Sequence, residues 1–335
     1  MKPDLGARFL SETDDDPALG ESGVSVIVVT YRNAAHIEAC VAALRKAAPS
    51  VPMELVIVDN DSGDDTADVA RKTAPDARVV ESGRNGGFAH GCGAGAARAR
   101  GRWLLFVNPD AVPAPGSIDA LLDCARQEPR AGIIGGRCVA ADGSNDPRSW
   151  WGRPTLWSTL CFALLLSTLF PGNRVFDPES PQPWSGKATE TRSVPIVTGA
   201  FMLVSREAWE ETGGFDTAFF MYGEDADLCL RAAAAGYRPK VTGRAVYEHE
   251  GGASSSSINK LIMLFTGKAM VVRRHLPPGL RVAGVLLLSF GVFVRALLSR
   301  LFSARPQRQG RPTAKGADWR GLWAARRDWT KGWKA

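Results

Sequence analysis

The sequence has no Cys-x-x-Cys pair, no internal repeat and no apolar segment near its N-terminus. Its six cysteines are scattered over 335 residues, which is typical of a protein kept in a reducing compartment and argues against a disulfide framework or a zinc site. The polar residues 1–22 do not resemble a secretory signal, and we expect them to form a flexible N-terminus.

Long hydrophobic runs are also missing. Two uncharged stretches, Thr155–Phe170 and Val282–Val294, would extend roughly 24 Å and 20 Å as helices, which is short of a hydrocarbon core about 30 Å thick. A membrane crossing at the first stretch would also divide the candidate site described below. We therefore expect amphipathic helices that lie in the membrane interface, with ordinary core packing as the alternative.

Positive charge is concentrated at the end of the chain. The net charge is +6, but ten Lys and Arg from Arg300 onward face only two Asp, a local net charge of +8 that leaves about −2 for the rest. The same tail carries four tryptophans in two pairs spaced four residues apart: Trp319, Trp323, Trp329 and Trp333. Tryptophan beside Lys and Arg at helical spacing is typical of a bilayer interface. Residues 258–335 are thus predicted to be a helical, membrane-associating region on anionic headgroups, with no nucleic-acid partner; a tail packed on the body is the alternative.

The body of the chain alternates strands and helices. The apolar runs predict strands at 24–30, 53–58, 77–81 and 103–107, each followed by a helical pattern, then an edge strand at 133–139 and a strand at 194–205 broken at Gly199. This alternation predicts an α/β fold with a mostly parallel sheet flanked by helices.

Polar residues stand where the predicted strands end. Thr30, Asp59 and Asp110 fall at carboxyl ends of strands, the rim where such sheets bind ligands. The Asp59 carboxylate suits a base edge or a ribose hydroxyl, although Asp also initiates turns. The Asp110 carboxylate, after Pro109, suits Mg²⁺ or Mn²⁺, which prefer oxygen ligands.

Two further stretches carry candidate chemistry. The glycine-rich segment 85–96 partly matches a dinucleotide-binding fingerprint, but the acid Asp59 precedes the glycines, which reverses the expected order. We expect these glycines to let the backbone approach a diphosphate or a sugar. Glu224, Asp225 and Asp227 open a predicted helix, and His249 follows the next strand, so proton transfer and metal binding are both conceivable there; capping of the helix is the alternative.

Seven motifs together resemble the inverting family 2 glycosyltransferases of the GT-A fold, especially the bacterial rhamnosyltransferase branch. They cover residues 24–254 and are, in order, SVIVVTYRN, IVDNDSGD, NGGFAHGCGAG, FVNPD, TGAFMLVSREAWEETGGFD, GEDADLCLR and HEGGAS. The resemblance implies a GT-A domain over 23–257, in which 150–192 is an insertion on the acceptor or membrane side.

The resemblance also implies roles for individual residues. Asp225 matches the catalytic base, Glu224 and Asp227 its support, and Asp110 and His249 the ligands of Mg²⁺ or Mn²⁺. The residues that would bind the nucleotide and the donor sugar are Thr30, Tyr31, Arg32, Asp59, Asn85, Gly87, Phe88, Asn108, Gly199 and Ala200. Two positions depart from the family pattern, because Asn108 replaces the first acid of the Asp-x-Asp motif and Gly93 replaces an Asn.

The expected activity is a metal-dependent, inverting sugar transfer in cell-surface polysaccharide synthesis. By resemblance, the first choice is L-rhamnose from dTDP-rhamnose, moved to a hydroxyl of a glycan or polyprenyl-linked acceptor by a peripheral enzyme on the cytoplasmic side of the bacterial inner membrane. A UDP-hexose or galactofuranose transferase of the same fold comes next. A nicotinamide-dependent oxidoreductase and a non-catalytic membrane-binding module are less favoured. The sequence does not indicate an oligomeric state.

Overall fold

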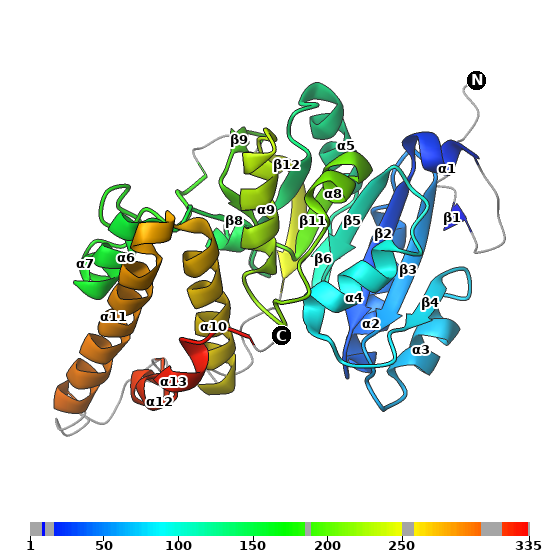
Figure 1. The fold of residues 1–335 in the computed structure, drawn as a ribbon. Helices are drawn as coiled ribbons and strands as arrows, with labels where there is room; N and C mark the ends of the chain where they lie inside the picture. The colour runs from blue at the N-terminus through cyan, green and yellow to red at the C-terminus, as the bar shows by residue number, and fades with distance from the viewer. Residues whose placement is uncertain (1–8, 11–16, 185–188, 250–257, 303–316, 334–335) are drawn as a thin grey trace.

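The computed structural model describes residues 9–10, 17–184, 189–249, 258–302 and 317–333. A twisted sheet forms the centre, and a group of mostly C-terminal helices stands beside it (Figure 1). Two pieces of the segment expected to be flexible have defined structure. Strand β1 (Phe9–Leu10) pairs with the sheet, and helix α1 (Pro17–Ser22) buries Leu19.

The first half of the chain builds a parallel sheet. The order β4–β3–β2–β5 places neighbours in parallel register, with Thr30 opposite Asp59 at the carboxyl ends. The four strands are β2 (Val24–Thr30), β3 (Met53–Asp59), β4 (Arg78–Glu81) and β5 (Trp103–Val107). These bounds confirm the strands expected from the apolar runs.

The second half extends the sheet beyond β5. Strand β11 (Phe201–Ser205) runs antiparallel to β5 and to β7 (Ile133–Val139), and β12 (Lys240–His249) runs parallel to β7. The short strands β6 (Ala111–Pro113) and β9 (Thr191–Ser193) both pair with β12. The predicted edge position of 133–139 was wrong, because β7 lies between β11 and β12.

The expected strand at 194–205 is divided at Gly199. Its first part, β10 (Ile196–Val197), leaves the main sheet and pairs with β8 (Trp150–Trp151). Its second part is β11. The chain therefore changes direction at Gly199, beside the carboxyl end of β5.

Helices cover both faces of the sheet and bury its alternating side chains. Val26 and Val28 belong to one core cluster, and Ile27 and Val29 to the other, as the two-residue period of a strand requires. The helices are α2 (Ala34–Lys46), α3 (Thr66–Thr73), α4 (Gly87–Ala96), α5 (Ser117–Gln127), α8 (Arg206–Thr212) and α9 (Glu224–Ala234).

The glycines of segment 85–96 mainly serve packing. The segment forms helix α4, and Gly91 and Gly95 face the sheet, where a Cβ would lie 2.5 Å from a methyl carbon of Val29 or Ile27. No larger residue fits without moving the helix away from the strands. The expectation that a diphosphate or a sugar approaches here is corrected for Gly91 and Gly95, because the sheet occupies the space that they leave, and it stays a prediction for the other glycines.

We expect the substitution Gly95→Ala to destabilise the fold by about 1–3 kcal/mol, because the new methyl group overpacks Ile27 and Val58. Gly93→Ala on the same helix is the matched control, since a Cβ there meets no atom within 4 Å. That control should be neutral, or stabilising by up to about 1 kcal/mol through helix propensity. Urea unfolding measures both, and equal free energies of unfolding would contradict the packing role.

The C-terminal helices form a second body of packed side chains beside α9 (Figure 1). They are α10 (Ile258–His275), α11 (Arg281–Phe302), α12 (Trp319–Ala324) and α13 (Arg326–Trp329), and they pack with α6 (Leu156–Ala163) and α7 (Leu166–Leu169). Trp329 is fully buried, and the rings of Trp319 and Trp323 contact Phe265 and Phe293. Trp319, Trp323 and Trp329 therefore pack within this group, as the alternative to a membrane-facing stripe supposed, and Trp333 contacts Phe220 instead.

The two uncharged stretches do not have the lengths assumed for them. Thr155–Phe170 is two short helices that break at Leu165, whose φ is +64°. By contrast, α11 continues past Val294. The segment Pro278–Leu301, whose most apolar 18-residue window has a mean hydropathy of 2.1, is long and apolar enough to cross a membrane by length and composition. The run was expected to end at Arg295, but this side chain is turned inward.

Arg295 is only 8% exposed. Its guanidinium donates hydrogen bonds to the backbone oxygens of Phe162 and Gly291 and to Thr168 Oγ1, and it lies 3.8 Å from the centre of the Phe162 ring. The guanidinium thus donates hydrogen bonds to acceptors on α6 and α7. Because this side chain points inward, the outer face of α11 stays apolar.

Candidate active site

The start of helix α9 presents the candidate catalytic carboxylate. Tyr222 and Gly223 precede it with φ values of +65° and +95°, so the chain turns sharply before Glu224. Gly223 is the N-cap, and no side chain makes a capping hydrogen bond there, which disfavours the helix-capping alternative. Asp225 Oδ2 instead accepts a hydrogen bond of 3.2 Å from the Gly199 amide.

Burial distinguishes the two adjacent acids. Glu224 is 6% exposed, and burial together with the charge of Asp225 raises its pKa to about 8. Burial also raises the pKa of Asp225, against the backbone amides of Ala226 and Gly199 that favour its charged form. Burial thus favours the protonated form of Glu224 at neutral pH, and the raised pKa makes the Asp225 carboxylate a stronger base than an ordinary aspartate.

Asp110 and His249 meet at the carboxyl ends of β5 and β12. Asp110 Oδ1 lies 3.1 Å from His249 Nε2, and Asn108 Nδ2 lies 3.4 Å from the same nitrogen. Burial acts to raise the pKa of Asp110, but the hydrogen bond and charge of His249 outweigh it and hold this pKa below its ordinary value. The predicted metal ligands are thus brought together from positions 139 residues apart.

This pair fits a divalent cation. An ionised carboxylate and an imidazole nitrogen are ligands that Mn²⁺ and Mg²⁺ accept, and both side chains are partly exposed. Within the described part of the chain, no group of three or more His, Cys, Asp or Glu forms a complete cage. The protein would therefore supply two ligands and leave the remaining positions open. Residues 250–254 of the HEGGAS motif lie outside the described residues.

At the proposed nucleotide end of the site, several polar groups already make hydrogen bonds within a turn of the chain. The Asp59 carboxylate accepts hydrogen bonds from the hydroxyl and the amide of Ser62, and it is 7% exposed, as for a residue that initiates a turn. Thr30 is fully buried and donates to the Val58 carbonyl. The Tyr31 ring is 43% exposed, and the exposed Arg32 guanidinium lies 5.3 Å from that ring while its Nε donates to the Ser62 carbonyl.

Asn60 organises the next loop and was not predicted. Its side-chain amide donates to Asn85 Oδ1 and to the Gly87 carbonyl, each at 3.1 Å. Gly87 has a φ of +85°, and a Cβ there would lie 1.9 Å from the Phe220 oxygen, which accepts a hydrogen bond from the Phe88 amide. The position of Asn60, directly after a strand-end acid, was a signal that sequence reasoning could have used.

Gly199 and Ala200 connect these pieces. A Cβ at Gly199 would lie 3.4 Å from the Phe88 ring and 3.7 Å from the Asp225 side chain, and the Ala200 carbonyl accepts from the Asn108 amide. Tyr222 lies near both the acids of α9 and Asp110. Burial and the charges of Glu224 and Asp110 raise the pKa of its hydroxyl. The base candidate and the metal pair therefore lie on one edge of the sheet.

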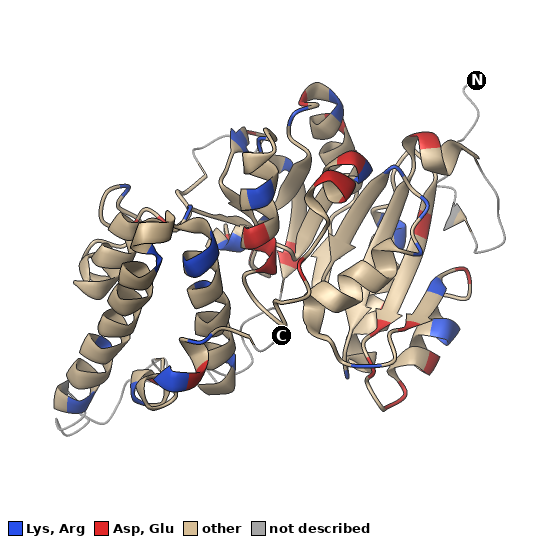
Figure 2. Cartoon of the chain, viewed as in Figure 1, with Lys and Arg blue, Asp and Glu red and all other residues tan. Residues whose placement is uncertain are grey.

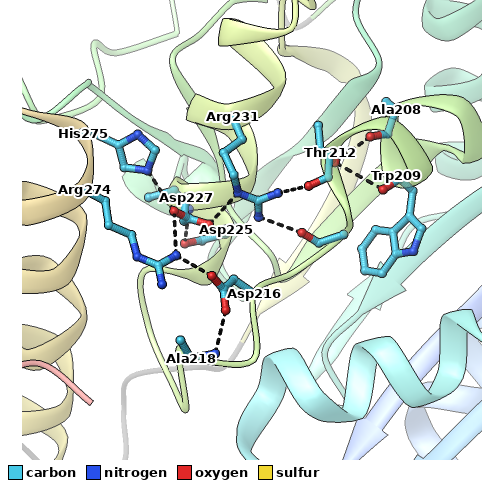
Figure 3. A network of polar contacts seen from close by, with 12 residues as sticks. Ala208, Trp209, Thr212, Asp216, Ala218, Asp225, Asp227, Arg231, Arg274 and His275 are labelled. Carbon is cyan, nitrogen blue, oxygen red and sulfur yellow. Dashed lines mark hydrogen bonds and ion pairs between the residues drawn. The ribbon is translucent and has the colours of Figure 1, made fainter. Parts of the chain in front are cut away.

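Asp227 has a different role from the one expected. Figure 3 shows its carboxylate, 1% exposed, beside Arg231, Arg274 and His275, at 2.7, 3.4 and 2.9 Å. Arg274 also pairs with Asp216 at 2.5 Å. Burial acts to raise the pKa of Asp227, but the hydrogen bond from His275 and the charges of Arg231 and Arg274 lower it. Asp227 thus connects α10 to α9, the helix that carries Asp225, and supports Asp225 only indirectly.

A curled, mostly parallel sheet with an Asp–His pair and a helix-borne carboxylate on its carboxyl edge defines a glycosyltransferase of the GT-A fold. Residues 25–213 match the sequence profile "Glycosyl transferase family 2", and residues 185–276 match "Glycosyl transferase family group 2". The chain belongs to glycosyltransferase family 2.

Three relatives indicate where in the family the chain lies. The N-acetylglucosaminyl-diphospho-decaprenol L-rhamnosyltransferase of Mycobacterium tuberculosis is 33% identical over 229 residues, 63% of this chain and 71% of that protein. The O-antigen biosynthesis protein RfbC of Myxococcus xanthus is 32% identical over 48% of this chain and 12% of its own length. The rhamnosyltransferase WbbL of Escherichia coli is 52% identical over 40 residues, 12% of this chain and 15% of its own.

Solved structures support the fold. The mannosyltransferase PcManGT of Pyrobaculum calidifontis, in complex with GDP-Man and Mn²⁺, matches 96% of this chain and 85% of its own with a TM-score of 0.54 at 20% identity. GalNAc-T7 with UDP, GalNAc and Mn²⁺ matches 77% of this chain and 48% of its own with a TM-score of 0.53 at 15% identity.

Proposed function

We propose that this chain transfers a sugar from a nucleoside-diphosphate donor to a hydroxyl of a lipid-linked glycan, with inversion at the anomeric carbon. L-Rhamnose from dTDP-rhamnose is the first candidate, because the relative that is 33% identical is named as an L-rhamnosyltransferase acting on a diphospho-decaprenol. The observation that carries the chemistry is the Asp225 carboxylate, fixed by the Gly199 amide on the same edge of the sheet as Asp110 and His249.

Asp225 would act as the general base. Its carboxylate takes the proton of the acceptor hydroxyl while that oxygen bonds to the anomeric carbon, and the bond from this carbon to the diphosphate oxygen breaks. One displacement from the face opposite the leaving group inverts the anomeric centre. The hydrogen bond to Gly199 fixes the orientation of the carboxylate, and the protonated Glu224 beside it avoids a second negative charge.

Asp110 Oδ1 and His249 Nε2 would hold Mn²⁺ or Mg²⁺, with the Asn108 amide beside them. A cation bound there neutralises charge on the departing diphosphate. The Mn²⁺ in the complexes of PcManGT and GalNAc-T7 supports this assignment. Tyr31 and Arg32, the open groups at the other end of this edge, are suited to contact the nucleotide.

The metal assignment predicts that Asp110→Ala and His249→Ala each weaken Mn²⁺ binding more than about tenfold in the presence of dTDP. Each substitution removes one of two protein ligands, and metal affinity falls about 10- to 100-fold even when supporting residues change. Electron paramagnetic resonance of free Mn²⁺ gives the affinity. Asp142→Asn, at an exposed turn, is the matched control. Unchanged affinity in both alanine variants would remove these residues from the cation site.

The proposed reaction is tested with a panel of donors. Purified protein is incubated with a polyprenyl-diphosphate-linked N-acetylglucosamine and, separately, dTDP-rhamnose, a UDP-hexose, UDP-galactofuranose or GDP-mannose. Release of the nucleoside diphosphate and the anomeric configuration of the product are measured. Inverted transfer from dTDP-rhamnose supports the first candidate, and inverted transfer from a UDP-linked sugar supports the second. Retention of configuration would overturn the mechanism.

We further propose that the enzyme works as a peripheral protein on the cytoplasmic side of the inner membrane, where a polyprenyl-linked acceptor is anchored. The apolar α11 and the excess of Lys and Arg over acids on the C-terminal helices (Figure 2) support a membrane setting.

A further inference from the structure

A groove of about 610 Å³ lies between α10, α11 and the α12–α13 segment, away from the residues assigned to catalysis. Arginines from three of these elements line it: Arg273 of α10, Arg281 of α11, and Arg326 and Arg327 of α13. Most of its exposed wall is apolar and includes Val282, Val285 and Leu286 of α11 and Trp323 of α12. We name this feature the arginine groove.

The positive charge of the arginine groove is uncompensated. Among the described residues, no carboxylate lies within 4 Å of any of its four guanidinium groups. The adjacent Arg274, by contrast, pairs with Asp216 and Asp227. Arg281 and Arg326 donate to backbone carbonyls, which fixes their orientation but leaves their charge. Like charges gathered in this way favour an anionic ligand.

The apolar part of the groove continues along α11. Val282, Leu286, Phe290, Phe293, Leu297 and Leu301 recur at spacings of three and four, and each is between 37% and 72% exposed. This row, which we name the α11 stripe, is about 28 Å long at the helical rise of 1.5 Å per residue. It carries no charge, because Arg295 points to the opposite side and is held by α6 and α7.

Together these two features match a lipid better than a soluble anion or a nucleic acid. A phosphate-bearing lipid presents a compact negative head and a long apolar chain, and the arginine groove adjoins one end of the α11 stripe in the same way. A nucleic-acid strand would need positive charge along its whole path. An exposed apolar row of this length on a helix is typical of a surface that contacts acyl chains.

We propose that the arginine groove binds the phosphate group of a membrane lipid, while the α11 stripe lies against the lipid chains. The site deepens the proposed function, on whose membrane setting it rests, by naming the residues that hold the protein on the bilayer. Arg273 directly precedes Arg274 and His275, which pair with Asp227 two residues after the proposed base. Lipid held in the groove thus lies on the helix that is fastened to the catalytic helix.

Vesicle flotation of the full chain tests the site without any sugar donor. Three vesicle types are used: phosphatidylcholine alone, the same with phosphatidylglycerol, and the same with a polyprenyl diphosphate. The triple variant Arg281→Gln, Arg326→Gln, Arg327→Gln should lose binding to both anionic types on the order of tenfold or more. Arg300→Gln, Arg320→Gln, Lys331→Gln removes the same charge from these helices outside the groove, and it should lose far less.

Two further variants distinguish the possible outcomes of this experiment. Leu286→Asn should weaken binding while all four arginines remain. Arg327→Gln alone, at an exposed position, tests the site if the triple variant does not fold. Equal loss in the two triple variants, no flotation of the wild type, or binding of inorganic pyrophosphate without preference for anionic vesicles would each overturn the proposal. Transfer to a water-soluble acceptor should be unchanged in the groove variant, so failure of the lipid site and failure of the proposed reaction give different results.

Discussion

Asp225→Asn is expected to lower the rate of sugar transfer by about 10²–10⁴-fold while donor affinity stays nearly unchanged. The amide has the shape of the carboxylate and can still accept the hydrogen bond from the Gly199 amide, but it cannot take the proton of the acceptor hydroxyl. Initial rates at saturating donor give the loss, and titration with dTDP in the absence of acceptor gives the affinity. Activity within a factor of two of wild type would remove Asp225 from the role of base.

The neighbouring acid provides the matched control. Because burial and the charge of Asp225 raise the pKa of Glu224 to about 8, this side chain is neutral at pH 7, and Glu224→Gln replaces one neutral group with another. We expect Glu224→Gln to keep activity within about tenfold of wild type, as a change that leaves the proton acceptor in place. If Glu224→Gln were inactive and Asp225→Asn active, Glu224 and not Asp225 would be the general base.

The pH dependence of the reaction follows from the same geometry. A base must be ionised, so kcat/KM should fall as the pH drops through the pKa of Asp225. Burial raises this pKa, which places the acidic limb above the ordinary Asp value of about 3.9. A profile that stays flat down to pH 4 would contradict the assignment.

Asp227→Asn is expected to destabilise the protein by about 1–3 kcal/mol, because it removes a buried carboxylate that accepts hydrogen bonds from Arg231, Arg274 and His275. The Asp227 carboxylate is 1% exposed, whereas Arg231 and Arg274 are 28% and 35% exposed, so water replaces the lost contacts only in part (Figure 3). Urea unfolding measures the change. Asp216→Asn is the matched control, since the Asp216–Arg274 pair is about one-third exposed and such pairs contribute about 0–1 kcal/mol.

Acid should remove the difference between wild type and Asp227→Asn. The folded-state pKa of Asp227 is lowered by its cationic partners, so its contribution to stability is complete above the unfolded pKa near 3.9 and is lost as pH falls through the folded value. The two unfolding free energies should therefore converge below about pH 4. A difference that stays constant well below pH 4 would assign the effect of the substitution to packing instead.

The parallel half of the fold was predictable because its strands are continuous apolar runs buried on both faces. The pattern of 133–139 gave the correct strand but the wrong position, since its neighbours β11 and β12 come from segments more than 60 residues later. Gly91 and Gly95 were misinterpreted for a related reason. A missing Cβ is equally compatible with a ligand and with a closely packed strand, and only the contact with Ile27 and Val29 decides between them.

The positions of candidate site residues could be predicted where these residues stand at the carboxyl ends of strands. The alternation of strands and helices placed Thr30, Asp59 and Asp110 on one rim, and the family resemblance added His249 beside Asp110. The partners of Asp227 could not, because Arg274 and His275 lie 47 and 48 residues away on a helix whose docking no local pattern encodes. The length of α11 was missed because the apolar run was taken to end before the charged Arg295, whereas α6 and α7 supply acceptors for its guanidinium.

The end of the described chain returns to the catalytic loop. The Trp333 ring lies 5.4 Å from the Phe220 ring, and the Trp333 amide donates to Met270 Sδ at 3.1 Å. The carbonyl of Phe220, which stands two residues before Tyr222, accepts a hydrogen bond from the Phe88 amide. Ending the chain at residue 257 would therefore remove contacts from the loop that carries Phe220 and Tyr222. Protein made for crystallisation or assays should retain the C-terminal helices and carry any affinity tag at the other end.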